Sequence, residues 1–364
     1  MISSAQIPVF DGHNDVLLRL HLGGGDPVAA FLDGQGGAGH LDLPRARAAG
    51  FAGGLFAIFV PSPAQAAAAS TAAQGKAGEG TQNLGPGAHE PEEVGLAGAQ
   101  AATLAMASLL VRIARASDGR VRICRSVADI RAAMADGAQA SVLHIEGAEA
   151  IDADLAMLDV LHQAGLRSLG PVWSRPNIFG FGVPFRFPSP PDIGPGLTDA
   201  GKRLIAACND LRILIDLSHL NEAGFWDVAR LSNAPLVATH SNAHAICAAS
   251  RNLTDKQLAA IRDSGGLVGV NYAVSFLRPD GARNADTPID VVVDHLAYMV
   301  ERLGEDGVAL GSDFDGALIA AGMGSVSGLP ALIAAMRTRG FGDALIEKIC
   351  HHNWLGVLER TWGA

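Results

Sequence analysis

Cysteine, basic charge and long apolar runs are all scarce in this sequence. Its four cysteines show neither the C-x-x-C spacing of a structural zinc site nor the density of a disulfide framework. The formal net charge of −10 disfavours nucleic acid and anionic membranes as partners. No segment offers about 18 uninterrupted apolar residues, so we expect no membrane span. The first residues, MISSAQIPVFDGHND, have neither a basic stretch nor a long apolar one, so we expect no signal peptide and a cytoplasmic location.

The composition is that of a folded protein with a large core. Of the 364 residues, 49% are hydrophobic and 18% are charged, which excludes a disordered chain. Length alone would allow two or three domains, but α/β barrels often reach this length as one domain.

Short apolar runs alternate with helical patterns along the whole chain. The runs are rich in Val, Ile, Leu and Phe without polar alternation, as in parallel strands that are buried on both faces. Eight such runs are present: PVFDGHND, GGLFAIFV, ASVLHIEG, RSLGPVWS, RILIDLSH, PLVATHS, GLVGVNY and VALGSDF. Eight strands that alternate with helices favour an α/β fold of the (β/α)8, or TIM barrel, type over a doubly wound sheet. We therefore predict a single barrel domain over residues 1–364.

Helix start signals support this alternation. Thr198 precedes a helical pattern and is a predicted N-cap, while Thr254 and Gln257 have the spacing of a capping box. One region has no periodicity: residues 62–94, after the second strand, are rich in Ala, Gly, Pro and Ser. A loop of this length is a lid, a binding loop or an insertion without a role, and the sequence leaves these alternatives open.

Polar side chains stand at the carboxyl ends of five predicted strands. Because these ends meet at one mouth of a barrel, we expect the six side chains to lie together. They are His13, Asp15, Glu146, His219, His240 and Asp313. His144 shares a face with Glu146 but precedes it by two residues, so we expect it deeper in the barrel.

Three imidazoles and three carboxylates are the ligands that Zn²⁺ and similar divalent ions prefer. Six residues suit two metal ions, with His13 and Asp15 on one ion and His219 and His240 on the other. Glu146 comes from a strand between the two groups and is the predicted bridge. Asp313 would either bind a metal or act as general base on the water between the ions. Any one of these motifs alone could be a polar strand end or a turn; the joint pattern favours a metal site.

Several long motifs resemble the membrane (renal) dipeptidase family, peptidase family M19, in the same order along nearly the whole chain. They are DGHND, GLTDAGKRLIAACNDLRILIDLSH, THSNAHAICAASRNLTDKQL and DHLAYMVERLGEDGVALGSDFDG. The resemblance implies a metal-dependent amidohydrolase barrel with two divalent ions, expected to be Zn²⁺. It also implies hydrolysis of the peptide bond of small dipeptides by a water shared between the ions, and it allows a homodimer.

The resemblance also assigns roles to single residues. His13, Asp15, Glu146, His219 and His240 match the metal ligands of the family. Asp313 matches the acidic residue beside the bridging water, where it would contact the substrate too. Arg251 matches an arginine that binds the carboxylate of the substrate, which suits a guanidinium because it can hold a carboxylate with two hydrogen bonds.

One position departs from the family pattern. Trp173 stands where the family usually has a substrate-binding histidine, and tryptophan offers one N–H donor and no basic nitrogen. Arg175 could supply the missing positive charge. The departure leaves two alternatives to a dipeptidase open: a metal amidohydrolase for another amide, such as an N-acyl amino acid or a cyclic amide, and a metal-retaining binding protein without catalysis.

Overall fold

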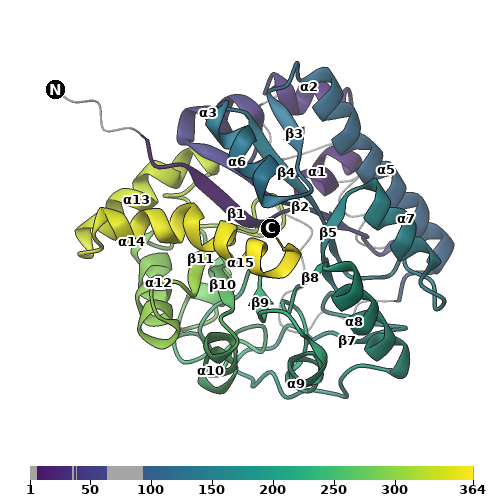
Figure 1. Ribbon diagram of the computed structural model, residues 1–364. Coiled ribbons are helices and arrows are strands. Elements are labelled where there is room, and N and C mark those ends of the chain that lie inside the picture. Colours follow the sequence, from purple (N-terminus) through teal and green to yellow (C-terminus); the bar gives the residue numbers. More distant parts are fainter. Residues whose placement is uncertain (1–5, 35–36, 38, 64–92, 364) are drawn as a thin grey trace.

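Eight parallel strands form the centre of the molecule (Figure 1). The computed structural model describes residues 6–34, 37, 39–63 and 93–363. The eight strands are β1 (Val9–Asn14), β2 (Phe51–Phe59), β4 (Gln139–Glu146), β5 (Leu166–Gly170), β8 (Leu214–Ile215), β9 (Val237–Ala238), β10 (Leu267–Val270) and β11 (Val308–Leu310). Each corresponds to one of the eight predicted apolar runs.

The strands curl into a barrel. Parallel pairing follows the order β1-β2-β4-β5-β8 in one sheet and β9-β10-β11 in another. Parallel bridges between Asp216 and Val237, and between Asn14 and Phe314, join the two sheets at both of their edges. The predicted (β/α)8 class is therefore confirmed. The division into one domain over the whole chain stays a prediction.

Three short strands lie outside the barrel order and were not predicted. β3 (Val121–Ile123) pairs with Gln139–Ser141 at the start of β4, on the edge of β4 opposite to β2. β6 (Pro176–Asn177) and β7 (Gly180–Phe181) form a small antiparallel hairpin in the loop after β5. Two or three residues are too few for a hydrophobic pattern to mark a strand.

Helices surround the barrel. The short Val326–Gly328 segment is a 3₁₀ turn, and Lys348–His352 is a π-helical turn that leads into the last helix. The α-helices are α1 (Val16–Leu22), α2 (Pro27–Leu32), α3 (Leu43–Ala49), α5 (Leu96–Ala116), α6 (Val127–Ala135), α7 (Ala156–Ala164), α8 (Asp199–Leu211), α9 (Glu222–Leu231), α10 (Asp255–Asp263), α11 (Val274–Leu277), α12 (Asp290–Leu303), α13 (Leu329–Thr338), α14 (Asp343–Glu347) and α15 (Asn353–Trp362).

Two predicted helix starts are confirmed by hydrogen bonds. The Thr198 side chain accepts from the backbone N–H of Gly201 at the start of α8. Thr254 and Gln257 form the capping box of α10, in which each side chain accepts from the backbone of the other residue. These bonds satisfy N–H groups that have no partner within the helix.

α5 is the longest helix and has an apolar composition. By length and composition it could cross a membrane, and a third of its most apolar stretch is buried within the molecule. Buried residues such as Met106, Leu110 and Ile113 recur every three or four positions, which is also the pattern of a core helix in a soluble protein. The expectation of no membrane span thus stays a prediction. The predicted insertion at 62–94 lies outside the described residues except at its two ends.

The strands approach one another closely around the carbonyl oxygen of Thr239. A Cβ at Gly12, Gly269 or Gly311 would overlap this one oxygen. Three strands therefore depend on glycine to close the barrel at the level of β9. This close approach fixes the backbone that leads into His240.

We predict that Gly311→Ala destabilises the protein, because its methyl group would overlap backbone that cannot move away. The expected loss is about 1–3 kcal/mol in the free energy of unfolding, measured by denaturant titration. Gly98→Ala in α5 is the matched control, since a Cβ there has nothing within 4 Å. It should be neutral or stabilise the protein by roughly 0.5–1 kcal/mol. Equal stability of the two variants would contradict the close approach.

Candidate metal centre

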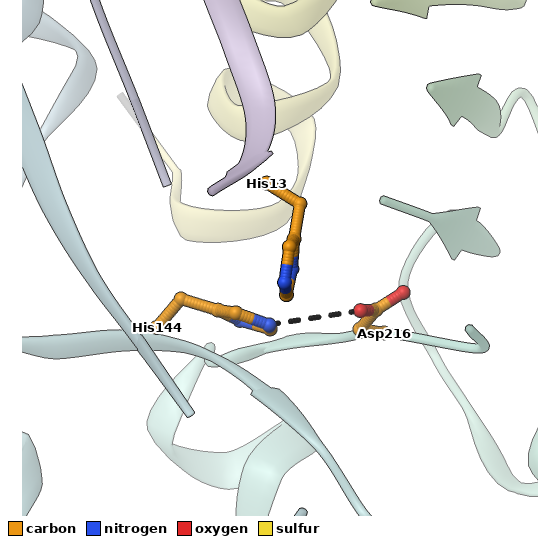
Figure 2. A group of neighbouring side chains, drawn as sticks. All are labelled: His13, His144 and Asp216. Atoms are coloured by element: carbon orange, nitrogen blue, oxygen red, sulfur yellow. Dashed lines mark ion pairs between the residues drawn. The ribbon is translucent and has the colours of Figure 1, made fainter. Parts of the chain in front are cut away.

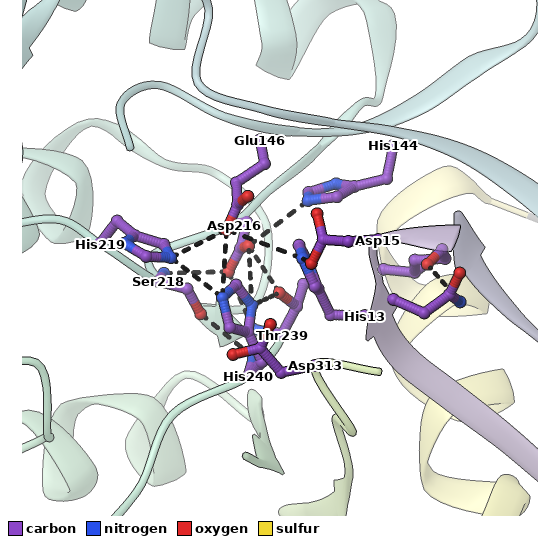
Figure 3. A network of polar contacts seen from close by, with 12 residues as sticks. His13, Asp15, His144, Glu146, Asp216, Ser218, His219, Thr239, His240 and Asp313 are labelled. Carbon is purple, nitrogen blue, oxygen red and sulfur yellow. Dashed lines mark hydrogen bonds and ion pairs between the residues drawn. The ribbon is translucent and has the colours of Figure 1, made fainter. Parts of the chain in front are cut away.

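The six predicted site residues converge at the carboxyl ends of the strands (Figure 3). His13 is the second-last residue of β1, and Asp15 follows this strand directly. Glu146 is the last residue of β4, while the remaining three follow β8, β9 and β11. Each of the six is at most 5% exposed, so the cluster is buried in the barrel mouth. The six are His13, Asp15, Glu146, His219, His240 and Asp313.

One carboxylate oxygen lies at the centre of this cluster. Oε1 of Glu146 is 2.8 Å from Nε2 of His219 and 3.3 Å from Nε2 of His240. Nε2 of His13 is 3.7 Å from the same oxygen and 3.3 Å from Oδ2 of Asp15. Three imidazoles thus present the same nitrogen to one carboxylate.

The nitrogen atoms suit a bound cation. Nε2 of His219 lies 3.0 Å from Nε2 of His240, although neutral imidazoles whose Nδ1 carries the proton would place two lone pairs face to face there. The Nδ1 atoms of both rings are engaged by hydroxyls, of Ser174 at 2.7 Å and Thr239 at 2.8 Å. Neither ring nitrogen of His13 has a hydrogen-bond partner among the described residues. Buried, unpartnered imidazole nitrogens beside carboxylates are the donor set of a divalent metal ion.

Burial changes the ionisation of this cluster. It lowers the pKa of His13 to about 4 and the pKa values of His219 and His240 well below the usual range. It raises the pKa of Asp15 to about 7, and that of Glu146 well above its usual value, helped by the charge of Asp15. The imidazoles are therefore neutral, as metal ligands must be, and a metal ion would supply positive charge next to Asp15 and Glu146.

Asp313 is held beside Asp15 by its backbone and by Asn271. Its backbone is left-handed, with φ at +58°, and the Asn271 amide donates to its Oδ2 at 2.9 Å. Burial first, and then the charge of Asp15, raise the pKa of Asp313 to about 6. A Cβ at Gly316 would overlap both carboxylates, so glycine is needed where this loop turns. Asp313 can therefore accept a proton near neutral pH.

His40 and Arg19 hold the loop that contains Asp313 through contacts with Asp315. Asp315 accepts from the His40 backbone at 2.6 Å, and its own N–H donates to Nδ1 of His40 at 2.9 Å. Nε of Arg19 lies 3.0 Å from Oδ2 of Asp315. These contacts hold the second left-handed residue of the loop, Asp315, in place.

Three groups of side chains among the described residues have metal-ligand spacing, with ligand atoms within 4.8 Å of one another. His13 takes part in all of them. Two groups belong to the predicted cluster: one with Glu146 and His240, the other with Asp15 and Asp313. The third combines His13 with His144 and Asp216 (Figure 2).

Arg251 lies next to His240, one of the three clustered histidines. Its guanidinium donates to Oγ of Ser241 at 2.8 Å and to the backbone oxygen of His240 at 3.0 Å. It is 4% exposed, and burial lowers its pKa to about 10, against the opposing effect of nearby carboxylates. Its Nε has no hydrogen-bond partner among the residues that the structure describes. A charged donor therefore lies beside the candidate metal centre.

Trp173 also borders the cluster. Its ring centroid is 5.7 Å from that of His219 and 4.9 Å from that of Phe59. Arg175 is fully buried, and its Nε bonds to Oε1 of Glu149 at 2.7 Å. The positive charge that Arg175 could supply is therefore balanced by Glu149. The Cζ of Arg175 lies 5.5 Å from the ring centroid of Trp173 and 5.2 Å from that of Phe59, so the guanidinium packs against both rings.

Sequence reasoning missed several supporting side chains, above all Asp216 and Thr239. Asp216 lies three residues before His219, and Thr239 directly precedes His240. A signal was present, because a carboxylate in the apolar run RILIDLSH needs a buried partner. His144 lies deeper in the barrel than Glu146, as predicted, with Nδ1 at 2.9 Å from Oγ of Ser168.

Eight parallel strands with imidazoles and carboxylates at their carboxyl ends define a metal-dependent hydrolase of the amidohydrolase barrel class. The sequence assigns the chain to one family within this class. The chain belongs to the membrane dipeptidase family, peptidase family M19, whose model matches residues 3–362. This confirms the predicted family.

Two solved structures are similar over nearly their whole length. A metallopeptidase from Rhodobacter sphaeroides, bound to a phosphinate mimic of the dipeptide L-Ala-D-Ala, is 55% identical with a TM-score of 0.92, covering 98% of this chain and 100% of its own. A second structure, a dipeptidase and metallopeptidase of family M19, is 54% identical with a TM-score of 0.90, covering 99% and 100%. An uncharacterised protein from the region 5′ of pqqA in Klebsiella pneumoniae is 50% identical over 70% of this chain and 94% of its own. Membership of a metallopeptidase family, with these clusters, indicates divalent metal ions.

We predict that the affinity for zinc rises between about pH 5.5 and pH 7.5, because ligand carboxylates must lose protons before they bind metal. The raised pKa values of Asp15 (about 7) and Asp313 (about 6) keep both protonated at the lower pH. The pKa of His13, near 4, keeps that imidazole neutral throughout. Chelator competition should show about tenfold weaker binding per pH unit for each proton displaced. An affinity that does not change over this range would contradict the burial of these carboxyls.

Proposed function

We propose that this protein is a zinc-dependent dipeptidase with two metal ions per chain. The observation that carries the proposal is the convergence of His13, His219 and His240 on one oxygen of Glu146, with Asp15 and Asp313 beside them. A relative at 55% identity binds a phosphinate mimic of L-Ala-D-Ala, which supports a small dipeptide as substrate.

The distances suggest how the ligands divide between the ions. His13 and Asp15 would hold one ion, and His219 and His240 the other, with Glu146 shared between them. When bound, such ions polarise the scissile carbonyl and lower the pKa of a water molecule, so that hydroxide is available near neutral pH. Zinc is proposed because imidazole and carboxylate ligands in a buried site suit it.

The chain's own residues then bind substrate and move the proton. Asp313, with a pKa near 6, would take a proton from the attacking water and return it to the leaving amine. Arg251 would hold the carboxylate of the substrate beside His240. Trp173 would form a wall of the substrate site next to His219, where its ring offers shape rather than charge.

Trp173, as a wall of the substrate site, supports a second candidate substrate class. Without a basic side chain at position 173, an N-acyl amino acid or a cyclic amide would also satisfy the metal ligands and Arg251. A binding protein without catalysis is less well supported, because both Glu146 and Asp313 are present. The homodimer and the cytoplasmic location inferred from the sequence stay predictions.

We predict that zinc-loaded protein hydrolyses dipeptides, including L,D pairs, and that removal of the metal by a chelator abolishes this activity, because the metal ions supply the charge that polarises the scissile carbonyl. Ninhydrin detection of released amino acids measures the rate. Restoration of activity by added zinc is the control. Cleavage of N-acyl amino acids or cyclic amides without cleavage of any dipeptide would favour the second substrate class.

Asp313→Asn should lower kcat by about 10²–10⁴-fold, because the amide cannot accept the proton of the attacking water. KM should change little. Rates should be compared at equal measured metal content, with Asp154→Asn, at an exposed carboxylate, as the control. A kcat close to that of the wild-type protein would remove Asp313 from its proposed role.

A further inference from the structure

Asp216 forms a buried hydrogen-bond centre among the side chains of the metal cluster (Figure 3). It follows β8 and is 1% exposed. Its Oδ1 accepts from the backbone N–H groups of Ser218 at 2.9 Å and Thr239 at 2.8 Å. Its Oδ2 accepts from the hydroxyl of Thr239 at 2.6 Å. The carboxylate thus ties the loop after β8 to the loop after β9.

The direction of these bonds determines where His240 carries its proton. The Thr239 hydroxyl has a single proton, and it donates this proton to Asp216, at the short distance of a charge-assisted bond. Its oxygen also lies 2.8 Å from Nδ1 of His240. Since the hydroxyl has no second proton to give, it accepts one from Nδ1. His240 therefore keeps its Nε2 lone pair free, on the side that faces Glu146.

The corresponding contact of His219 lacks this constraint. Nδ1 of His219 lies 2.7 Å from the hydroxyl of Ser174. Within the described ranges, this hydroxyl has no other hydrogen-bond partner, so it can either donate or accept. Thr239 is different because Asp216 takes its proton.

Asp216 also approaches the side of the cluster that holds His13. Its Oδ2 is 3.7 Å from Nε2 of His144, whose ring packs edge-on against that of His13, with 5.4 Å between centroids (Figure 2). Both oxygens of Asp216 already accept hydrogen bonds from Ser218 or Thr239.

We propose that Asp216, acting through the hydroxyl of Thr239, is a positioning residue that fixes the proton of His240 on Nδ1 and so presents Nε2 to a metal ion. The inference rests on the proposed function only in taking His240 as a metal ligand. It assigns a joint role to the motifs DLSH and ATHS, in which the carboxylate of the first orients the histidine of the second. Groups that orient metal-bound histidines in this way commonly change metal affinity by 10–100-fold.

Three variants test this positioning. Thr239→Val removes the hydroxyl at nearly constant shape. Asp216→Asn can turn an amide N–H toward Thr239, so that the hydroxyl donates to Nδ1 of His240 and the proton moves to Nε2. Both should weaken zinc binding at one of the two sites by about 10–100-fold in chelator competition. Thr239→Ser, the matched control, keeps the hydroxyl and should bind zinc as the wild-type protein does.

A second measurement determines the tautomer of His240 in the wild-type protein, so it does not depend on whether a variant folds. ¹⁵N NMR of histidine-labelled wild-type protein distinguishes the two imidazole tautomers, and His240→Asn identifies the signal of His240. The expected result is a proton on Nδ1 of His240. A proton on Nε2, or wild-type zinc affinity in folded Thr239→Val and Asp216→Asn, would overturn the inference. If the wild-type protein binds zinc as expected but cleaves no dipeptide, the proposed function fails while this inference stands.

Discussion

The convergence of three imidazoles on one oxygen of Glu146 is the contact on which the rest of the site depends. His219, His240 and His13 approach Oε1 of Glu146 from 2.8 to 3.7 Å, in a region with almost no solvent exposure. Burial of carboxylates is costly, and the raised pKa values of Asp15 and Glu146 express that cost. A divalent metal would relieve it, so burial and metal binding are two aspects of one arrangement.

The backbone bears part of the cost of this arrangement. His219 and Asp313 both adopt left-handed conformations, with φ at +70° and +58°, each of which costs roughly 1–3 kcal/mol outside glycine. Close packing of Gly12, Gly269 and Gly311 around the Thr239 carbonyl holds the end of β11, from which the chain runs into Asp313. The barrel therefore supplies the rigidity that keeps strained loops in place.

Much of this could be predicted from the sequence. The strands RILIDLSH and PLVATHS end in His219 and His240, and parallel strands of a barrel bring their carboxyl ends together. The pairing of Arg175 with Glu149 could not be predicted, because 26 residues separate them and no local pattern links them. The hydrogen bonds of Asp216 to Thr239 depend likewise on the closure of β8 against β9. Periodicity predicts elements, whereas side-chain partners follow from three-dimensional contact.

The most direct test of the account is anomalous diffraction from crystals of the zinc-loaded protein at the zinc absorption edge. Two anomalous peaks per chain are expected, one on each side of the Glu146 carboxylate, with His13 and Asp15 at one peak and His219 and His240 at the other. A single peak, or peaks away from Glu146, would contradict it.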